Sequence, residues 1–140
     1  MNDKIENLST QNINIVKKLY EAFGKHDFEF ILSILSGDVE WGEPANPFNP
    51  AAGTRHGHEG FLEWLKIGRE SEEILTLEPH KFLSDSETVA VIGYTKCLAK
   101  PTNKIYETDF VHLFLFKDGK IIKFQEYFDT YAAGEAFRNS

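Results

Sequence analysis

Two runs of apolar, aromatic and β-branched residues near the end of the chain flank one Asp-Gly pair, and this stretch constrains the fold most. Residues 106–116 read YETDFVHLFLF, and residues 120–129 read KIIKFQEYFD. An Asp-Gly pair between two such runs is a strong signal for a β-hairpin. Four polar residues interrupt the runs where a purely apolar core would not need them: Asp109, His112, Glu126 and Asp129.

The register of this hairpin decides which polar residues share a face, because side chains alternate along a strand. A type I turn with Gly119 as a left-handed bulge would pair His112 with Phe124 and place Glu126 diagonally from His112 on the same face. A tight two-residue turn would instead place His112 and Glu126 on opposite faces. The bulged turn also gathers five phenylalanines on the face of His112, so we expect it.

The composition indicates one globular domain. The chain has 140 residues, and its 12 phenylalanines suggest an aromatic interior or cavity. Its net charge is −7 and its basic residues form no cluster, so we expect neither nucleic acid nor membrane as a partner. Its single cysteine, Cys97, is predicted to be a small buried residue in a reducing compartment. We find no apolar run typical of a signal peptide or a membrane span, so we expect a cytoplasmic protein.

Helical spacing of apolar residues marks the first part of the chain. We expect residues 1–8 to be a flexible lead-in, followed by a helix that Ser9 or Thr10 caps and Gly24 ends. Asp27 is predicted to cap a second helix, because its side chain can accept from the first free backbone N–H groups.

Residues 42–56 are predicted to form a long loop, because they include three prolines and two glycines. Long ordered loops in compact domains are often rims of a site. Arg55 could bind a ligand anion there or pair with a nearby carboxylate that fixes the loop. A third helix is predicted to begin at Gly57 or His58.

Strands dominate the remainder, at about residues 75–83 and 88–99 and in the hairpin, before a short helix at 130–138. Helices followed by a meander of about four strands indicate the α+β class. The expected architecture is a cone-shaped, curved antiparallel sheet with N-terminal helices packed on its concave face. We expect residues 1–140 to form a single domain. A cone of this size can hold a small apolar molecule.

This order of segments resembles the SnoaL-like and ketosteroid-isomerase-like branch of the nuclear transport factor 2-like (NTF2-like) superfamily. The matching segments are YEAFGKHDFEFILSILSGDVEW at residues 20–41, GTRHGHEGFLEWL at 53–65 and YETDFVHLFLFKDGKIIKFQEYFDT at 106–130. The resemblance implies a pocket between helices and sheet and a homodimer formed through the sheet. It implies function more weakly, because this fold hosts isomerases, cyclases, hydrolases, dehydratases and non-catalytic binders.

The resemblance also implies roles for particular residues. By position, His112 and Glu126 resemble the histidine and the acidic residue of the polyketide cyclases, in which the acid is aspartate. Glu43 follows the first strand, where ketosteroid isomerases carry their base. The oxyanion-hole acid of those isomerases falls at His112, and their essential tyrosine falls nearest Leu19, one place before Tyr20. These matches imply that His112, Glu126 and Glu43 are the catalytic residues.

Proton transfer next to a carbonyl group is the chemistry that these residue types suit. A carboxylate in an aromatic cavity has its charged form desolvated, which raises its pKa toward neutrality. Glu126 or Glu43 would be the base, and His112 would donate to the carbonyl oxygen or shuttle the proton. The pocket would hold a small apolar or aromatic ligand, and we expect its wall to include Tyr20, Trp41, Phe48, Phe61, Trp64, Tyr94, Phe110, Phe114 and Phe128.

Three interpretations stay open on the sequence alone. The first is a cofactor-free isomerase, cyclase or lyase, and the second is a non-catalytic binder of a hydrophobic ligand. The third is a dimeric structural domain with a vestigial pocket, in which His112 and Glu126 form only a hydrogen bond of the core. A metal site that uses His112 and Glu126 together with His56 or His58 is not expected, because no ligand pair has a compact helical spacing.

Overall fold

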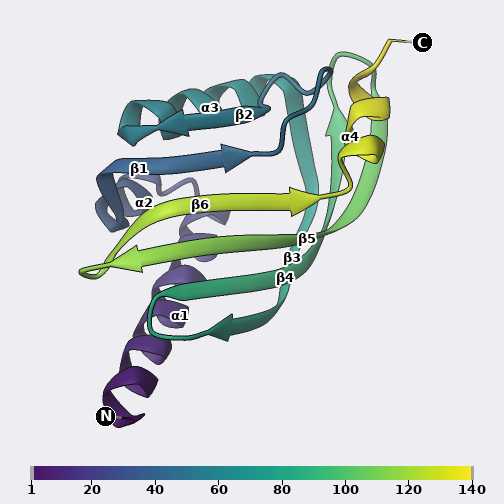
Figure 1. The fold of residues 1–140 in the computed structure, drawn as a ribbon. Helices are drawn as coiled ribbons and strands as arrows, with labels where there is room; N and C mark the ends of the chain where they lie inside the picture. The colour runs from purple at the N-terminus through teal and green to yellow at the C-terminus, as the bar shows by residue number, and fades with distance from the viewer. Residues whose placement is uncertain (1, 140) are drawn as a thin grey trace.

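The computed structural model of the chain describes residues 2–139, with side chains described from residue 6 onward. This part of the chain contains four helices and six strands (Figure 1). Their bounds are Asn2–Gly24 for α1, Phe28–Ile34 for α2, Leu35–Glu43 for β1, Gly53–His56 for β2, Gly57–Ser71 for α3, Glu72–Ser84 for β3, Thr88–Ala99 for β4, Lys104–Lys117 for β5, Lys120–Phe128 for β6 and Thr130–Phe137 for α4.

The strands form one curved, unclosed sheet in the order β2-β1-β6-β5-β4-β3. Neighbouring strands are antiparallel except β1 and β6, which are parallel. Helices α1, α2 and α3 lie on one side of the sheet, and α4 packs against β4 and β5 (Figure 1). Two register shifts in β3 help to bend the sheet, because a bulged strand bends locally. The predicted α+β class and the predicted curved sheet covered by N-terminal helices are confirmed.

The start of the first helix differs from the prediction, whereas the cap of the second agrees with it. Helix α1 begins at Asn2, so residues 2–8, predicted as a lead-in, are helical, and Ser9 and Thr10 lie inside the helix rather than at its cap. Asp27 caps α2 as predicted, because its side chain accepts a hydrogen bond from the backbone N–H of Phe30 at 3.2 Å.

The predicted loop 42–56 is shorter than expected. Strand β1 continues to Glu43, and β2 pairs antiparallel with it as an edge strand. Strand β2 was not predicted from the sequence, because this stretch is rich in proline and glycine. Arg55 fixes the remaining loop, because its Nη1 donates to the carbonyl oxygen of Ala51 at 2.7 Å and its Nε donates to Glu63 Oε1 at 3.3 Å. The structure thus favours pairing of Arg55 with a nearby carboxylate over the binding of a ligand anion.

The hairpin turn differs from the predicted bulged turn. Lys117 lies opposite Lys120, so the turn has only two central residues. Asp118 and Gly119 have φ values of 51° and 77°, and a type I′ turn requires positive φ at both positions. The predicted pairing of His112 with Phe124 is therefore wrong.

A bulge in β6 nevertheless restores the shared face. Phe116 lies opposite Ile121 and Leu115 opposite Lys123, so one extra residue, Ile122, stands unpaired in β6. Beyond this extra residue, each side chain of β6 lies on the opposite side of the sheet from the one it would have without the bulge. As a result, His112 lies directly opposite Glu126, and the prediction that these two side chains share a face is confirmed by a different register.

The core lies between helices α1–α3 and the facing side of the sheet. Val16 of α1, Phe61 of α3 and Phe114 of β5 are almost completely buried there. The opposite side of the sheet carries exposed apolar side chains such as Ile92 and Tyr127. A homodimer through this side stays a prediction. Within residues 2–139, each helix is too short or too polar to cross a membrane.

Candidate functional site

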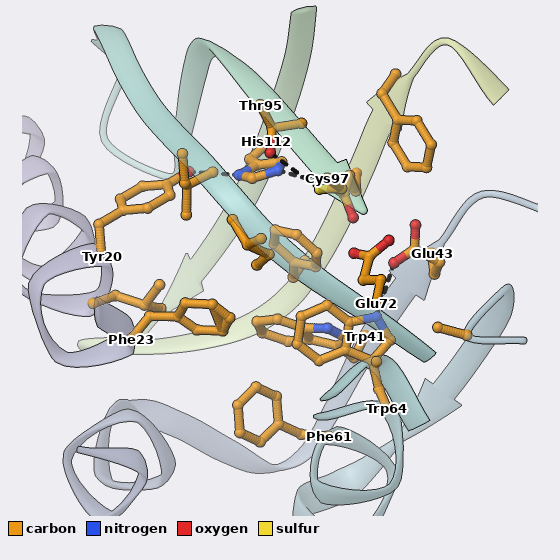
Figure 2. A pocket seen from close by; sticks show the side chains of 18 of the residues that line it. Tyr20, Phe23, Trp41, Glu43, Phe61, Trp64, Glu72, Thr95, Cys97 and His112 are labelled. Carbon is orange, nitrogen blue, oxygen red and sulfur yellow. Dashed lines mark hydrogen bonds and ion pairs between the residues drawn. The ribbon is translucent and has the colours of Figure 1, made fainter. Parts of the chain in front are cut away.

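A cavity lies between helices α1 and α3 and the inner side of the sheet (Figure 2). Its volume is about 100 Å³. An apolar cavity of ~150 Å³ holds one benzene molecule, so the free space here is about two thirds of that and approaches the scale of a single ring. Its wall consists of Leu19, Tyr20, Phe23, Ile31, Trp41, Glu43, Asn49, Ala51, Phe61, Trp64, Gly68, Glu72, Ile74, Leu77, Thr95, Cys97, Tyr106, His112, Phe114, Phe124, Glu126 and Phe128.

His112 lies in the wall between a helix and a strand. Its Nδ1 lies 2.6 Å from the hydroxyl oxygen of Tyr20, which reaches across from α1, and its Nε2 lies 3.1 Å from Glu126 Oε1 (Figure 2). The ring of Phe110 stacks on the imidazole at a centroid distance of 4.0 Å. Burial lowers the pKa of His112 to about 3, so the imidazole is neutral near pH 7.

The hydrogen bonds of His112 select one tautomer. An ionised Glu126 can only accept, so the neutral imidazole beside it carries its proton at Nε2 and donates it to Oε1. Nδ1 then accepts from the hydroxyl of Tyr20, which keeps its proton because burial and the nearby Glu126 raise its pKa. The contact between His112 and Glu126 is therefore a hydrogen bond from a neutral ring and not an ion pair.

Two carboxyl groups, those of Glu43 and Glu126, line this cavity and lie close enough for each to affect the pKa of the other. Burial raises the pKa of Glu126 to about 7. Burial and then the charge of Glu126 raise the pKa of Glu43 well above its ordinary value, although the indole N–H of Trp64 donates to Glu43 Oε1 at 2.9 Å. Near neutral pH the pair thus shares a proton, because two adjacent buried carboxylates repel each other.

A second polar group occupies the same cavity. Tyr106 donates to Glu72 Oε2 at 2.7 Å, and the nearby Cys97 thiol affects the pKa of both of these side chains. Burial raises the pKa of Glu72, and it raises the pKa of the Cys97 thiol to about 12. The thiol therefore stays protonated near neutral pH, which does not suit a nucleophile.

The structure gathers most of the predicted site residues around this cavity. All three predicted catalytic side chains reach its wall, and Glu43 and His112 are only 7% and 8% exposed. Their catalytic roles stay predictions. The predicted wall residues that line the cavity are Tyr20, Trp41, Phe61, Trp64, Phe114 and Phe128.

Three predicted wall residues lie elsewhere. Phe48 is 44% exposed on the loop after β1. Tyr94 pairs with Asp109 on the outer side of the sheet, because the inward positions of β4 are the odd-numbered ones. Phe110 is buried behind His112 and supports the imidazole without lining the cavity.

Sequence reasoning missed the second polar group. Glu72 lies before the strand predicted at about residues 75–83, but β3 begins with this residue. Tyr106 has the same parity as His112 in β5, so the alternation that identified His112 could also have identified Tyr106. Cys97 was correctly predicted to be buried, at 3% exposure, but its place in the cavity wall was not foreseen.

His56 and His58, considered as further metal ligands beside His112 and Glu126, do not line this cavity. His58 lies 3.0 Å from the backbone oxygen of Leu35 through its Nε2, and His56 is a residue of the edge strand β2. In the described residues, no group of three or more histidine, cysteine, aspartate or glutamate side chains is arranged to hold a metal ion.

Comparison with known proteins identifies the family. A sequence model of the SnoaL-like domain matches residues 16–124. The chain belongs to the SnoaL-like family. An NTF2-like protein from Burkholderia xenovorans LB400 is 32% identical, and the alignment covers 93% of this chain and 98% of that protein with a TM-score of 0.86. The predicted membership in the SnoaL-like branch of the NTF2-like superfamily is therefore confirmed.

Two further solved structures share the SnoaL-like fold of this chain. TerC, which was co-crystallised with polyporic acid, is 29% identical over 92% of this chain and 99% of its own, with a TM-score of 0.79. A protein from Mesorhizobium loti that is named as a SnoaL-like polyketide cyclase is 19% identical over 82% and 97%, with a TM-score of 0.67, and this likeness shows the fold alone. No curated protein matches the chain at a significant level.

Proposed function

We propose that this SnoaL-like protein is a cofactor-free enzyme that moves a proton on a small apolar carbonyl compound, as an isomerase, cyclase or lyase. The observation that carries the proposal is that the carboxyl groups of Glu43 and Glu126 line one aromatic cavity and affect each other's pKa. Such a pair supplies one ionised and one protonated carboxyl group near neutral pH.

Glu126 is the base in this proposal. Its pKa of about 7 suits a group that must be ionised at neutral pH and still hold a proton once it has taken one. The carboxylate would remove a proton from the carbon next to the carbonyl group. The electrons of that C–H bond form a C=C bond, and the carbonyl oxygen takes the negative charge of an enolate.

His112 and Tyr20 position this base. The neutral imidazole donates from Nε2 to Glu126 Oε1, and the hydroxyl of Tyr20 keeps the imidazole in the tautomer that can do so. Near neutral pH Glu43 holds the one proton that the pair shares, since the pKa of Glu43 is raised well above its ordinary value. Glu43 is therefore the acid that can return a proton to the enolate.

The size and lining of the cavity suggest the substrate class. Its free space is on the scale of one ring, and its wall is formed largely by aromatic and aliphatic side chains. A wider hollow beside α2 and β3 shares wall residues such as Trp64 and Glu72 with the cavity, so a longer substrate would extend into it. The related TerC was co-crystallised with polyporic acid, which supports a role for this fold in binding organic ligands.

The position of the polar residues favours the enzyme over the two alternatives. A pure binder of hydrophobic ligands would need only apolar walls, whereas His112, Glu126 and Glu43 all face one cavity. A vestigial pocket would be filled by side chains, whereas this cavity retains free space. Burial of three carboxyl groups also destabilises the folded state, and a purely structural core would avoid this by using apolar side chains.

Deuterium exchange tests the proposal without a known substrate. Acetophenone and related one-ring methyl ketones are incubated with the protein in D₂O, and the loss of the α-proton signal is followed by NMR. We expect enzyme-dependent exchange, which Glu126→Gln reduces by at least about 100-fold, a loss typical for a general base. Glu107→Gln is the matched control, because Glu107 is exposed on the outer side of β5. Equal exchange rates in the wild type and Glu126→Gln would refute the role of Glu126.

A further inference from the structure

The hydrogen-bond donors around the cavity are nearly all occupied. The hydroxyl of Tyr20 bonds to His112, the indole N–H of Trp64 to Glu43, and the hydroxyl of Tyr106 to Glu72. The imidazole N–H is directed to Glu126. These donors hold the carboxyl and imidazole groups in place, so they are not free for a ligand.

Trp41 is the exception in this wall. Its side chain is 3% exposed, and its ring is fixed by stacking on Phe124 at a centroid distance of 4.1 Å and by an edge contact with Phe61 at 4.7 Å. Its indole Nε1 has no hydrogen-bond partner. Among the buried side-chain nitrogens and oxygens of residues 6–139, only Ser36 Oγ shares this condition, and Ser36 is not in the cavity wall.

An unpaired buried donor is unfavourable, because it has lost its hydrogen bond to water and gained none. An indole N–H can only donate, so only an acceptor can pair with it. The other polar groups of the wall include three carboxyls, which repel a ligand oxygen when they are ionised. Beside the proton that Glu43 holds in the proposed function, the indole N–H of Trp41 is thus the buried donor of this wall that a ligand oxygen can satisfy.

The register of the sheet places this donor next to the carboxyl pair. Trp41 lies opposite Phe124 in the parallel β1–β6 ladder. Glu43 and Glu126 follow these two residues by two positions, so all four side chains project to the same side of the sheet. One small molecule in the cavity can thus have a C–H bond at Glu126 and an oxygen at Trp41.

We infer that the indole N–H of Trp41 binds the carbonyl oxygen of the substrate and stabilises the negative charge that develops there. The inference rests on the proposed function and narrows its substrate class to ketones and aldehydes with an acidic α-proton. The hydrogen bond strengthens as the oxygen becomes an enolate, so the donor lowers the barrier more than it tightens substrate binding. Its ring contacts hold it in place before the substrate arrives.

The two tryptophans allow a direct test. The chain contains only Trp41 and Trp64, and both line the cavity, so a ¹H–¹⁵N spectrum has two indole signals that report on it. Trp41→Phe and Trp64→Phe assign the signals. The wild-type protein is then titrated with acetophenone and, separately, with ethylbenzene, which has the same ring and nearly the same size but no oxygen.

We expect acetophenone to move the Trp41 indole proton downfield and ethylbenzene to leave it without a downfield shift. Equal shifts with the two ligands, or no shift of either indole with acetophenone, would overturn the inference. Trp41→Phe should lower the rate constant of deuterium exchange at saturating ketone about 10-fold to 100-fold, with less than about a threefold change in KM.

The two proposals fail separately. A downfield shift of Trp41 without any deuterium exchange would support the carbonyl site and refute the enzyme. In the other case, deuterium exchange depends on Glu126 but is unchanged in Trp41→Phe, and both ligands shift the indole signals equally. That result would support the enzyme and refute the role of Trp41.

Discussion

Glu126 lies directly opposite His112 in the β5–β6 ladder, and its Oε1 lies 3.1 Å from His112 Nε2. Such a pair on a protein surface would be an imidazolium and a carboxylate. Here burial lowers the pKa of His112 to about 3 and raises that of Glu126 to about 7, so the histidine is a neutral donor and the glutamate titrates near neutrality. The pair therefore suits proton transfer better than charge pairing.

The pH profile of ketone exchange should be bell-shaped. Glu126 must be ionised to act as a base, so kcat/KM should rise as the pH passes about 7. The rate should fall again at higher pH, where Glu43, whose pKa is raised well above its ordinary value, loses the remaining proton. Glu43→Gln should keep the rising limb and lose the falling one. Loss of the rising limb in this variant would mean that Glu43, and not Glu126, is the base.

The stability of the protein should also depend on Glu126. The pKa of this group is about 7 in the folded state against 4.5 for an unperturbed glutamate, so the folded chain binds more protons between these values. Its contribution to stability is fully present below pH 4.5 and is lost as the pH rises through 7. Glu126→Gln should therefore gain about 2 kcal/mol over the wild type between pH 5 and pH 8, measured by urea unfolding. A constant difference across this range would contradict the raised pKa.

Tyr20→Phe should disturb the base without touching the carboxyl pair. Removal of the hydroxyl leaves His112 Nδ1 without its donor, so the imidazole can move its proton to Nδ1 and cease to donate to Glu126. The rising limb of the pH profile should move to higher pH, and the exchange rate at pH 7 should fall about 10-fold, which is less than the ~10²-fold or greater loss typical for a general base itself. The ¹⁵N chemical shifts of His112 would show the change of tautomer. Tyr131→Phe is the control, because this tyrosine is 77% exposed.

Gly93 is required where β4 passes the ring that supports His112. A Cβ atom at this position would overlap with the backbone oxygen of Glu78 and with the ring of Phe110. Gly93→Ala should thus destabilise the protein by about 2 kcal/mol and displace Phe110 from the imidazole. Gly24→Ala is the control, since a Cβ there meets no heavy atom within 4 Å, and it should not lower stability. Chemical denaturation of both variants gives the comparison.

Much of the fold followed from local patterns. The alternation in residues 88–99 and 104–117 predicted two strands and the inward position of His112, and Asp27 predicted the start of α2. The same alternation places Tyr94 on the outer side of the sheet, so the prediction that Tyr94 lines the pocket is wrong. The edge strand β2 was missed because a four-residue strand next to prolines has no periodic signal of its own.

Which residue types face the interior could be predicted from the sequence, because alternation along a strand is fixed by backbone geometry within a few residues. The hairpin turn at Asp118 and Gly119 could be predicted in the same way. Which inward groups meet depends on the tertiary structure. The bulge at Ile122 restores the shared face of His112 and Glu126, and the parallel pairing of β1 with β6 brings Glu43 to Glu126. Packing of α1 brings Tyr20 to His112. Contacts between segments far apart in the chain depend on how the whole sheet bends and packs, and no local pattern of residues encodes that.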